Sequence, residues 1–155
     1  MHLSREENVF RVRRKFAFDA GHRIANHQGQ CRHLHGHRYV MELTLVGLLE
    51  TDEKASDYGM VLDFGAIKTI AHAAVIDRWD HAFLVDSRDE VVVNFLKTLP
   101  DHKTVILDGP PTAEWLAKTA FNILAPLYEQ AFETRLKLES VLLFETPNCA
   151  AEYQG

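Results

Sequence analysis

The sequence is poor in cysteine and has no long apolar run. Only Cys31 and Cys149 occur among its 155 residues, which is too few for a disulfide framework. No segment approaches the roughly 20 apolar residues that cross a bilayer. Residues 1–8 are polar and charged, unlike a signal peptide. We therefore expect a cytoplasmic protein that is not bound to a membrane, in which Cys31 persists as a free thiol.

A strong excess of charge of either sign is also missing. The formal net charge is −5, and there is no long basic block of the kind that nucleic-acid-binding proteins usually show. Nucleic acid is therefore not an expected partner. The hydrophobic content of 46% and charged content of 25% are ordinary for a globular protein. We expect residues 1–8 to form a tail and residues 9–155 to form a single domain.

The spacing of apolar residues predicts four strands and two helices. Asp63 and Thr112 are the expected N-caps of the two helices, and residues 90–97 fit a short helix or a strand equally well. The predicted strands cover residues 9–18, 37–49, 104–107 and 136–145. This order favours an α+β fold in which the helices cover one face of a mostly antiparallel sheet. We expect the first two strands to be neighbours, and likewise the last two.

Histidine, by contrast, is concentrated in one segment. Nine histidines occur in the chain, and five of them fall within residues 22–37. Histidine is the commonest metal-ligating side chain, so this segment is a candidate metal site. The five are His22, His27, His33, His35 and His37.

The pair His35 and His37 has the spacing of two ligands on one strand. Residues i and i+2 of an extended chain point to the same face, with Cβ atoms ~6.5 Å apart. Two imidazoles at that separation can converge on one ion with Zn–N distances of about 2.0–2.1 Å. His22 follows the first predicted strand, and it comes within reach if the first two strands pair.

Three histidine ligands would leave the fourth tetrahedral position open, as in catalytic zinc sites. Two other interpretations remain open at this point. The histidines could be solvated loop residues, or Cys31 could be a fourth ligand in a closed structural zinc site that performs no chemistry. In each case we expect His27 and His33 not to be ligands, and to lie beyond the metal ligands, beside a substrate or in solvent.

Cys31 precedes His35 by four residues. A thiol near a metal dication and an imidazole ionises more readily, and a thiolate can act as a general base or a nucleophile. An isolated cysteine can equally be an inert small apolar residue. Asp80 and His81 form an adjacent acid–imidazole pair, for which chemistry alone favours a helix-end aspartate and a surface histidine.

Two glutamates occupy positions that call for an explanation. Glu114 stands in the first turn of the second predicted helix, where a carboxylate suits the helix dipole. Glu145 ends an otherwise apolar strand. It marks either the start of solvent exposure or an acceptor for a pair of buried donors.

Six segments, taken together and in order, resemble the 6-pyruvoyltetrahydropterin synthase / 6-carboxytetrahydropterin synthase family. The match runs from about residue 10 to residue 153. One such motif would be weak, but six in the expected order are specific. The segments are F-D-A-G-H-R (18–23), C-R-H-L-H-G-H (31–37), G-M-V-L-D-F (59–64), W-D-H (79–81), P-T-A-E (111–114) and F-E-T-P-N (144–148).

The resemblance implies a fold and an assembly. The fold would be the tunnelling fold, a four-stranded antiparallel sheet with two helices packed on one face. Subunits would join their sheets into a barrel, as trimers stacked into a hexamer. The active sites would lie at the subunit interfaces.

The resemblance also implies a site and a reaction. Zn²⁺ would be held by His22, His35 and His37, and the catalytic group would be Cys31, Asp80 and His81. Glu145, and less strongly Glu114, would bind the guanidine-like edge of the pterin through parallel hydrogen bonds. The substrate would be 7,8-dihydroneopterin triphosphate. Zinc would act on its side chain as a Lewis acid, and the Cys31 thiolate would move protons.

The short gap between Cys31 and His35 indicates the branch of the family. The pattern C-x-x-x-H-G-H resembles the branch that makes 6-carboxytetrahydropterin, the queuosine precursor, with loss of acetaldehyde and triphosphate. A 6-pyruvoyltetrahydropterin synthase is the alternative, and a zinc hydrolase is a more distant one. The sequence departs from the family pattern at Gly21, at Trp115 and in extra residues around 86–103. It offers Arg23, Arg38 and Lys68 as candidates for binding the triphosphate.

Overall fold

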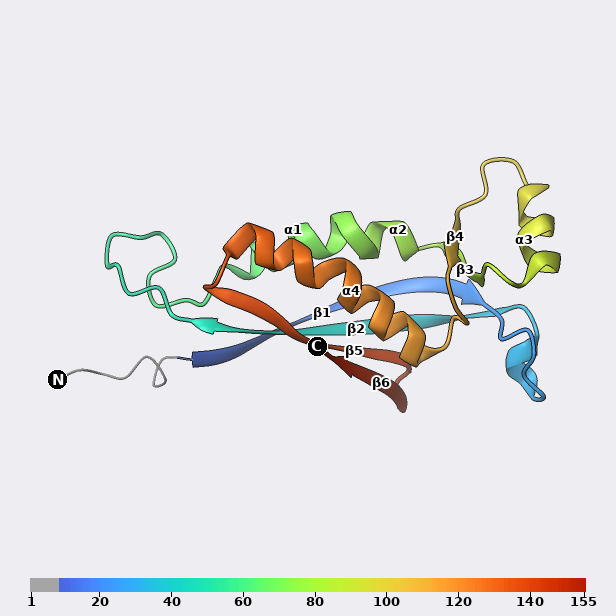
Figure 1. The fold of residues 1–155 in the computed structure, drawn as a ribbon, viewed down its shortest axis with the longest axis horizontal. Coiled ribbons are helices and arrows are strands. Elements are labelled where there is room, and N and C mark those ends of the chain that lie inside the picture. The colour runs from blue at the N-terminus through green and yellow to red at the C-terminus, as the bar shows by residue number, and fades with distance from the viewer. Residues whose placement is uncertain (1–8) are drawn as a thin grey trace.

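The computed structural model describes residues 9–155, and the predicted tail, residues 1–8, lies outside them. A six-stranded sheet with the strand order β4-β3-β1-β2-β5-β6 forms the centre of the fold (Figure 1). Four of its strands run antiparallel, and two short strands extend the sheet in parallel beside β1. The strands are β1 (Val9–His22), β2 (His35–Leu48), β3 (Ala82–Asp86), β4 (Thr104–Leu107), β5 (Leu136–Thr146) and β6 (Cys149–Gln154).

The expected α+β class agrees with this architecture, but the expected number of strands and one expected pairing are wrong. The sheet has six strands rather than four. The apolar pattern did not predict β3 and β6. The strands 104–107 and 136–146 are not neighbours. The first pairs with β3, whereas the second pairs with β2. Strand pairing between distant segments is set by packing, which the local pattern does not encode.

The helices begin where the two predicted caps stand. The side chain of Asp63 accepts a hydrogen bond from the Gly65 amide at the start of α1 (Phe64–Ala71). The helical run continues through a π-helical turn, His72–Ile76, into α2 (Asp77–Trp79). The undecided segment 90–97 is a helix, α3 (Glu90–Lys97). The long helix α4 (Ala113–Phe132) follows the Thr112 cap and retains Pro126 within it.

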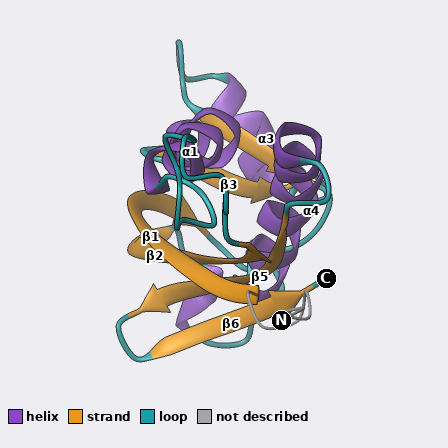
Figure 2. Cartoon of the chain, turned by 90° about the vertical axis from the view of Figure 1, so that its left-hand side faces the viewer, coloured by secondary structure: helices purple, strands orange, loops and turns teal. Residues whose placement is uncertain are grey.

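The core lies between the sheet and helices α1 and α4, which cover the same face of the sheet (Figures 1 and 2). Alternate residues of β1 and β2, among them Phe18, Tyr39 and Met41, are buried on this face. The opposite face carries polar residues such as Lys15 and Glu42. Because neighbouring strand residues point to opposite faces, the sheet has one apolar face and one largely polar face. Within residues 9–155, no helix has the length and apolar character needed to cross a membrane.

Candidate active site

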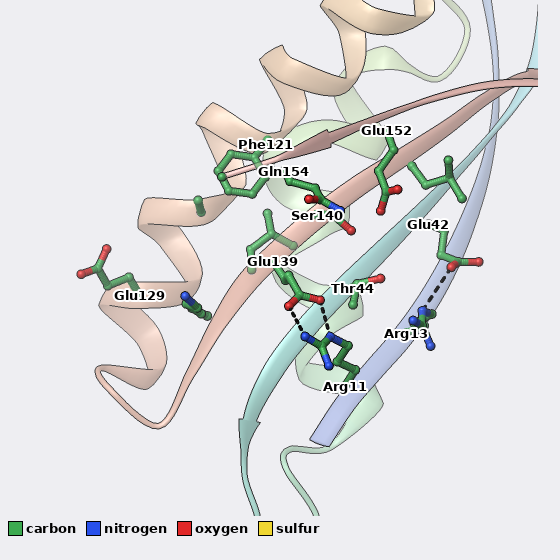
Figure 3. Close-up of a pocket in the computed structure, with 15 residues that line it drawn as sticks. Arg11, Arg13, Glu42, Thr44, Phe121, Glu129, Glu139, Ser140, Glu152 and Gln154 are labelled. Atoms are coloured by element: carbon green, nitrogen blue, oxygen red, sulfur yellow. Dashed lines mark hydrogen bonds and ion pairs between the residues drawn. The ribbon is translucent and has the colours of Figure 1, made fainter. Parts of the chain in front are cut away.

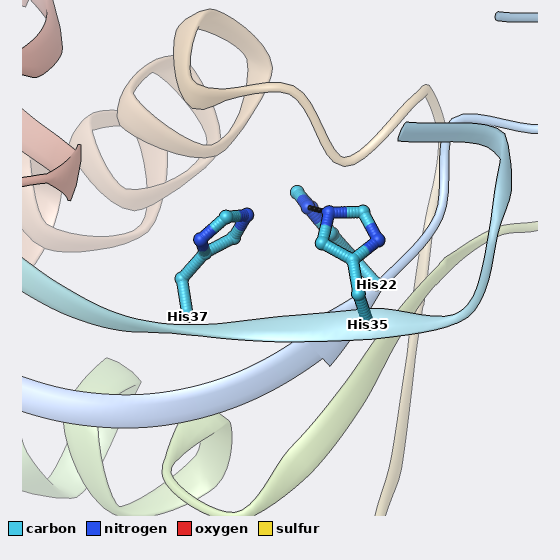
Figure 4. Close-up of side chains that lie close together, drawn as sticks. All are labelled: His22, His35 and His37. Carbon is cyan, nitrogen blue, oxygen red and sulfur yellow. Dashed lines mark hydrogen bonds between the residues drawn. The ribbon is translucent and has the colours of Figure 1, made fainter. Parts of the chain in front are cut away.

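The three predicted metal ligands come together where β1 ends and β2 begins. In the register of this antiparallel pair, His22 lies opposite His35, and Ala20 lies opposite His37. All three side chains therefore project from the face of the sheet that the helices cover. Figure 4 shows their rings pointing toward one another, and one nitrogen of each lies within 4.8 Å of the other two.

Backbone carbonyls orient two of the imidazoles. His22 Nδ1–H donates to the Pro111 carbonyl oxygen at 2.8 Å, and His35 Nδ1–H donates to the His33 carbonyl oxygen at 2.6 Å. A carbonyl oxygen only accepts hydrogen bonds, so the hydrogen of each neutral ring is on Nδ1. Each Nε2 therefore presents a lone pair, which is the arrangement that metal-binding histidines usually show.

The two Nε2 atoms of His22 and His35 lie 3.0 Å apart. Two lone pairs that face each other have no hydrogen to share, but a cation between them would satisfy both. Tetrahedral Zn–N bonds of about 2.0–2.1 Å would separate the two nitrogens by roughly 3.3 Å. His37 Nε2 is also buried without a hydrogen-bond partner among the described residues, with Glu145 Oε1 at 3.4 Å. This donor set could hold a metal ion.

Burial keeps His22 in the form that binds metals. Its side chain is almost fully buried. Its pKa is lowered to about 4, and loss of hydration is the largest cause. The hydrogen bond to Pro111 raises the pKa, and the charges of His35 and His37 lower it further. At neutral pH the His22 imidazole is therefore uncharged, as a metal ligand must be.

A cavity of about 270 Å³ adjoins this cluster and brings several predicted site residues together. Cys31, from the 3₁₀ turn Gln30–Arg32, and Glu145, from the end of β5, both line it. Glu114 lines it from the first turn of α4. The cavity thus combines an imidazole of the candidate metal cluster with two thiols and two carboxylates. Its lining residues are His22, Ile24, His27, Cys31, Thr112, Ala113, Glu114, Glu145, Cys149 and Ala150.

Some residues at this site were not singled out from the sequence. The Tyr39 hydroxyl oxygen lies 3.1 Å from His22 Nδ1, so the Nδ1–H donates a bifurcated hydrogen bond to Tyr39 and to the Pro111 carbonyl oxygen. Its position two residues after His37 on the same face of β2 is the signal that could have identified it. Cys149 lines the cavity because it begins β6, directly after the turn that follows Glu145.

Asp80 and His81 lie away from that cavity. They pack against Asp19, whose amide donates to Asp80 Oδ1 at 2.9 Å and whose carbonyl oxygen accepts from the His81 amide at 2.6 Å. The side chains of all three residues cluster within 4.8 Å. Asp19 and His22 are three residues apart on β1, so their side chains point to opposite faces. Within one chain, this acid–imidazole pair and the histidine cluster are on different faces of the sheet.

The Asp80–His81 pair has the features of a constrained site. The pKa of Asp80 is lowered, mainly by the hydrogen bond from the Asp19 amide. His81 and Lys103 lower it further by smaller amounts, whereas burial raises it. His81 Nδ1 lies 2.9 Å from Asp80 Oδ2. The backbone of His81 has a φ of 60°, in the left-handed region that non-glycine residues seldom occupy. Asp80 is thus an ionised acceptor beside an imidazole that the backbone holds in place.

The three basic residues predicted to bind a triphosphate lie in different surroundings. Arg23 makes two hydrogen bonds of 2.6 Å to the buried Asp89 carboxylate. Arg38 donates to Asp19 at 3.0 Å and lines a second cavity of about 550 Å³ that also includes His37 and Glu145. Lys68 is exposed on α1, apart from both cavities. Of the three, only Arg38 shares a cavity with predicted site residues, namely His37 and Glu145.

A larger cavity, of about 780 Å³, is a different feature (Figure 3). It is lined by charged residues of both signs along the sheet, and Arg11 is paired there with Glu139 at 2.6 Å. None of the predicted site residues lines it. The smaller cavity beside the histidines is therefore the candidate active site.

Comparisons with known proteins identify the family of this chain. The family model of 6-pyruvoyl tetrahydropterin synthase matches residues 11–155. A Rickettsia bellii protein named 6-carboxy-5,6,7,8-tetrahydropterin synthase is 37% identical over 145 residues, which cover 93% of this chain and 99% of that protein. A protein of the same name from Haemophilus influenzae is 32% identical, covering 94% and 99%.

Solved structures share the fold. The 6-pyruvoyl tetrahydropterin synthase of Plasmodium vivax superposes with a TM-score of 0.72 at 20% identity, covering 95% of this chain and 98% of that one. The Caenorhabditis elegans 6-pyruvoyl tetrahydropterin synthase gives a TM-score of 0.63 at 24% identity, covering 95% and 96%. With the sequence match over nearly the whole chain, these likenesses establish that the protein is an enzyme of the 6-pyruvoyl tetrahydropterin synthase family.

Proposed function

We propose that this enzyme is a zinc-dependent carbon–carbon lyase that converts 7,8-dihydroneopterin triphosphate to 6-carboxy-5,6,7,8-tetrahydropterin. One water molecule would be consumed, and acetaldehyde and triphosphate would be the other products. The 6-carboxy product would feed queuosine biosynthesis. The observation that carries the proposal is the convergence of three imidazoles beside a cavity lined by the Cys31 thiol. Two of these imidazoles donate a hydrogen bond from Nδ1 to a backbone carbonyl oxygen. The names of the relatives that match over nearly full length support the choice of product.

The chain's own residues would bind the metal ion and transfer protons. His22, His35 and His37 would hold Zn²⁺, which supplies Lewis-acid polarisation of the substrate's side-chain oxygens when bound. The Cys31 thiolate would accept and return protons within the same cavity.

Glu145 and Glu114 would bind the substrate. Glu145 would accept paired N–H groups of the pterin. Its carboxylate lies at the boundary between the cavity and the metal ligands, 3.4 Å from His37, so a bound pterin would present its side chain to the metal. Glu114 lines the same cavity and would be a second acceptor.

Asp80 and His81 would act on the substrate bound to a neighbouring subunit. Within one chain they lie on the other face of the sheet from the histidine cluster, so a second copy would bring them to the cavity. We therefore propose a homo-oligomer, with two trimers stacked into a hexamer and active sites at subunit interfaces. The largely polar face of the sheet would line the barrel that the subunits enclose.

Mass spectrometry of the products after incubation with 7,8-dihydroneopterin triphosphate tests the proposed reaction. The expected products are the 6-carboxy pterin and acetaldehyde, formed by the zinc-loaded protein and not by the chelator-treated protein. Formation of 6-pyruvoyltetrahydropterin without acetaldehyde would assign the enzyme to the other branch of the family. No turnover of any dihydropterin would refute both assignments and leave a zinc hydrolase as the next candidate.

Co-expression of two inactive variants tests the interface. Cys31→Ala and His81→Ala subunits, carrying different affinity tags, should recover activity when they assemble together. With random assembly, about a quarter of the interfaces would combine an intact Cys31 with an intact His81 of the neighbour. If both residues act within one chain, the mixed oligomer stays inactive, and the proposed interface is wrong.

A further inference from the structure

We propose that Trp115 is a positioning residue for His22 and that it acts through residues 108–112, here called the Pro111 loop. The inference rests on the proposed function, since it concerns the ligand through which the chain would hold zinc. Trp115 lies in the first turn of α4 and does not line the candidate active-site cavity. Its effect on the site would therefore be indirect.

The first link is the hydrogen bond between His22 and the Pro111 loop. Pro111 is buried, and its carbonyl oxygen accepts from His22 Nδ1–H at 2.8 Å. This bond sets both the tautomer and the ring orientation that direct the Nε2 lone pair to the other histidines. The carbonyl can do so only while its peptide plane keeps its direction. Whatever holds the Pro111 loop therefore holds the ligand.

Trp115 contacts the Pro111 loop on both sides of Pro111. Its indole Nε1–H donates to Asp108 Oδ1 at 3.2 Å, and its amide donates to Thr112 Oγ1 at 3.2 Å. The indole ring packs directly on Gly109, because a Cβ atom at position 109 would come within 2.1 to 2.5 Å of three ring atoms. The loop is thus held before and after the carbonyl that accepts from His22.

The loop has its own internal constraint, which makes this support effective. The Thr112 amide donates to the Pro110 carbonyl oxygen at 2.8 Å, closing a tight turn around Pro111. Pro110 and Pro111 each have a fixed φ, so the turn moves as a unit. A shift at Asp108 or Gly109 would therefore tilt the Pro111 carbonyl rather than be absorbed between them. This couples the Trp115 contacts to the direction of His22 Nε2.

The test uses three variants that disturb the same contact. Trp115→Ala removes the ring, and Trp115→Phe keeps a ring on Gly109 but loses the bond to Asp108. Gly109→Ala pushes on the ring from the loop side. Zinc affinity is measured by competition with a chelator, and the Co²⁺-loaded protein reports the ligand geometry through its visible spectrum. We expect zinc to bind about tenfold more weakly to Trp115→Ala and Gly109→Ala, as for other partners of metal ligands.

A matched control separates this effect from general loss of stability. Phe132→Ala also truncates a partly buried aromatic residue of α4, one that stacks on Tyr128 roughly 26 Å further along the helix. It should lower the stability and leave the zinc affinity and the Co²⁺ spectrum unchanged. Trp115→Phe should show a smaller loss of zinc affinity, and it carries the test if Trp115→Ala fails to fold.

The outcomes distinguish this inference from the proposed function. If the unmodified protein binds no zinc, the proposed function and this inference fall together. If it binds zinc and the Trp115 and Gly109 variants bind it equally well, with an unchanged spectrum, the positioning role alone is wrong. The same conclusion follows if Phe132→Ala weakens zinc binding as much as the variants at the Pro111 loop do.

Discussion

The metal-free protein should lose stability between pH 7.5 and pH 5, and His22 should be the main cause. The folded chain holds this buried imidazole at a pKa of about 4, against 6.5 for an exposed histidine. Below pH 6.5 the unfolded chain takes up a proton that the folded chain does not accept until about pH 4. Stability from the neutral form is therefore complete above pH 6.5 and is lost as the pH falls toward 4.

The size of the effect follows from the two pKa values. Their difference is equivalent to about 3 kcal/mol in total, at 1.36 kcal/mol per pKa unit. Most of it, about 2 kcal/mol, should be lost by pH 5. Carboxylates with lowered pKa values, such as Asp89, contribute to the pH dependence mainly at lower pH. The interval from pH 7.5 to pH 5 therefore separates the effect of His22 from that of these carboxylates.

Urea unfolding of chelator-treated protein at pH 7.5 and pH 5 measures this loss. His22→Asn is the control, because its amide can still donate to the Pro111 carbonyl oxygen but does not titrate. The free energy of unfolding should fall by about 2 kcal/mol more in the unmodified protein than in His22→Asn. Equal decreases in the two proteins would show that burial of His22 does not govern its protonation, and the reasoning would be wrong.

Four further substitutions test the candidate site and two ion pairs outside it. Cys31→Ala should keep its zinc in metal analysis, and its turnover should fall about 10²-fold or more, as expected on removal of a general base. Loss of both zinc and fold would instead identify Cys31 as a structural ligand. Glu145→Gln should raise KM for the pterin more than it lowers kcat, and an unchanged KM would remove Glu145 from the binding site. Asp89→Asn should lower the free energy of unfolding by about 3 kcal/mol, because it leaves Arg23 unpaired. Glu139→Gln, at an exposed ion pair, should lower it by less than about 1 kcal/mol. Equal losses in urea unfolding would contradict this ranking.

Local patterns were enough to predict the two strands that carry the histidine cluster. The apolar alternation before His22 and after His37 predicted β1 and β2, and their pairing places the two histidines on one face. The Thr112 cap correctly marked the start of α4. These features depend on residues that are close in sequence, which is why spacing reveals them.

The elements that the sequence did not reveal depend on distant contacts. β6 is a strand of small and polar residues with no apolar alternation, and it is fixed by pairing with β5. Residues 90–97 contain three consecutive valines that suit a strand. They form a helix because Asp89 caps it and because Val92 and Leu96 pack together with Val85 of β3. Tertiary packing decides between two local preferences here.

The division of the proposed site between two chains has its origin in the spacing along β1. Asp19 and His22 are three positions apart on β1, and because this offset is odd, an extended strand directs their side chains to opposite faces. Asp19 anchors Asp80 and His81, whereas His22 belongs to the cluster of three histidines that could hold a metal ion. No rotation of side chains can bring the two groups together across a paired strand. If both groups act on one substrate, the polar face of one sheet must therefore approach the histidine end of another, and assembly is a requirement for activity.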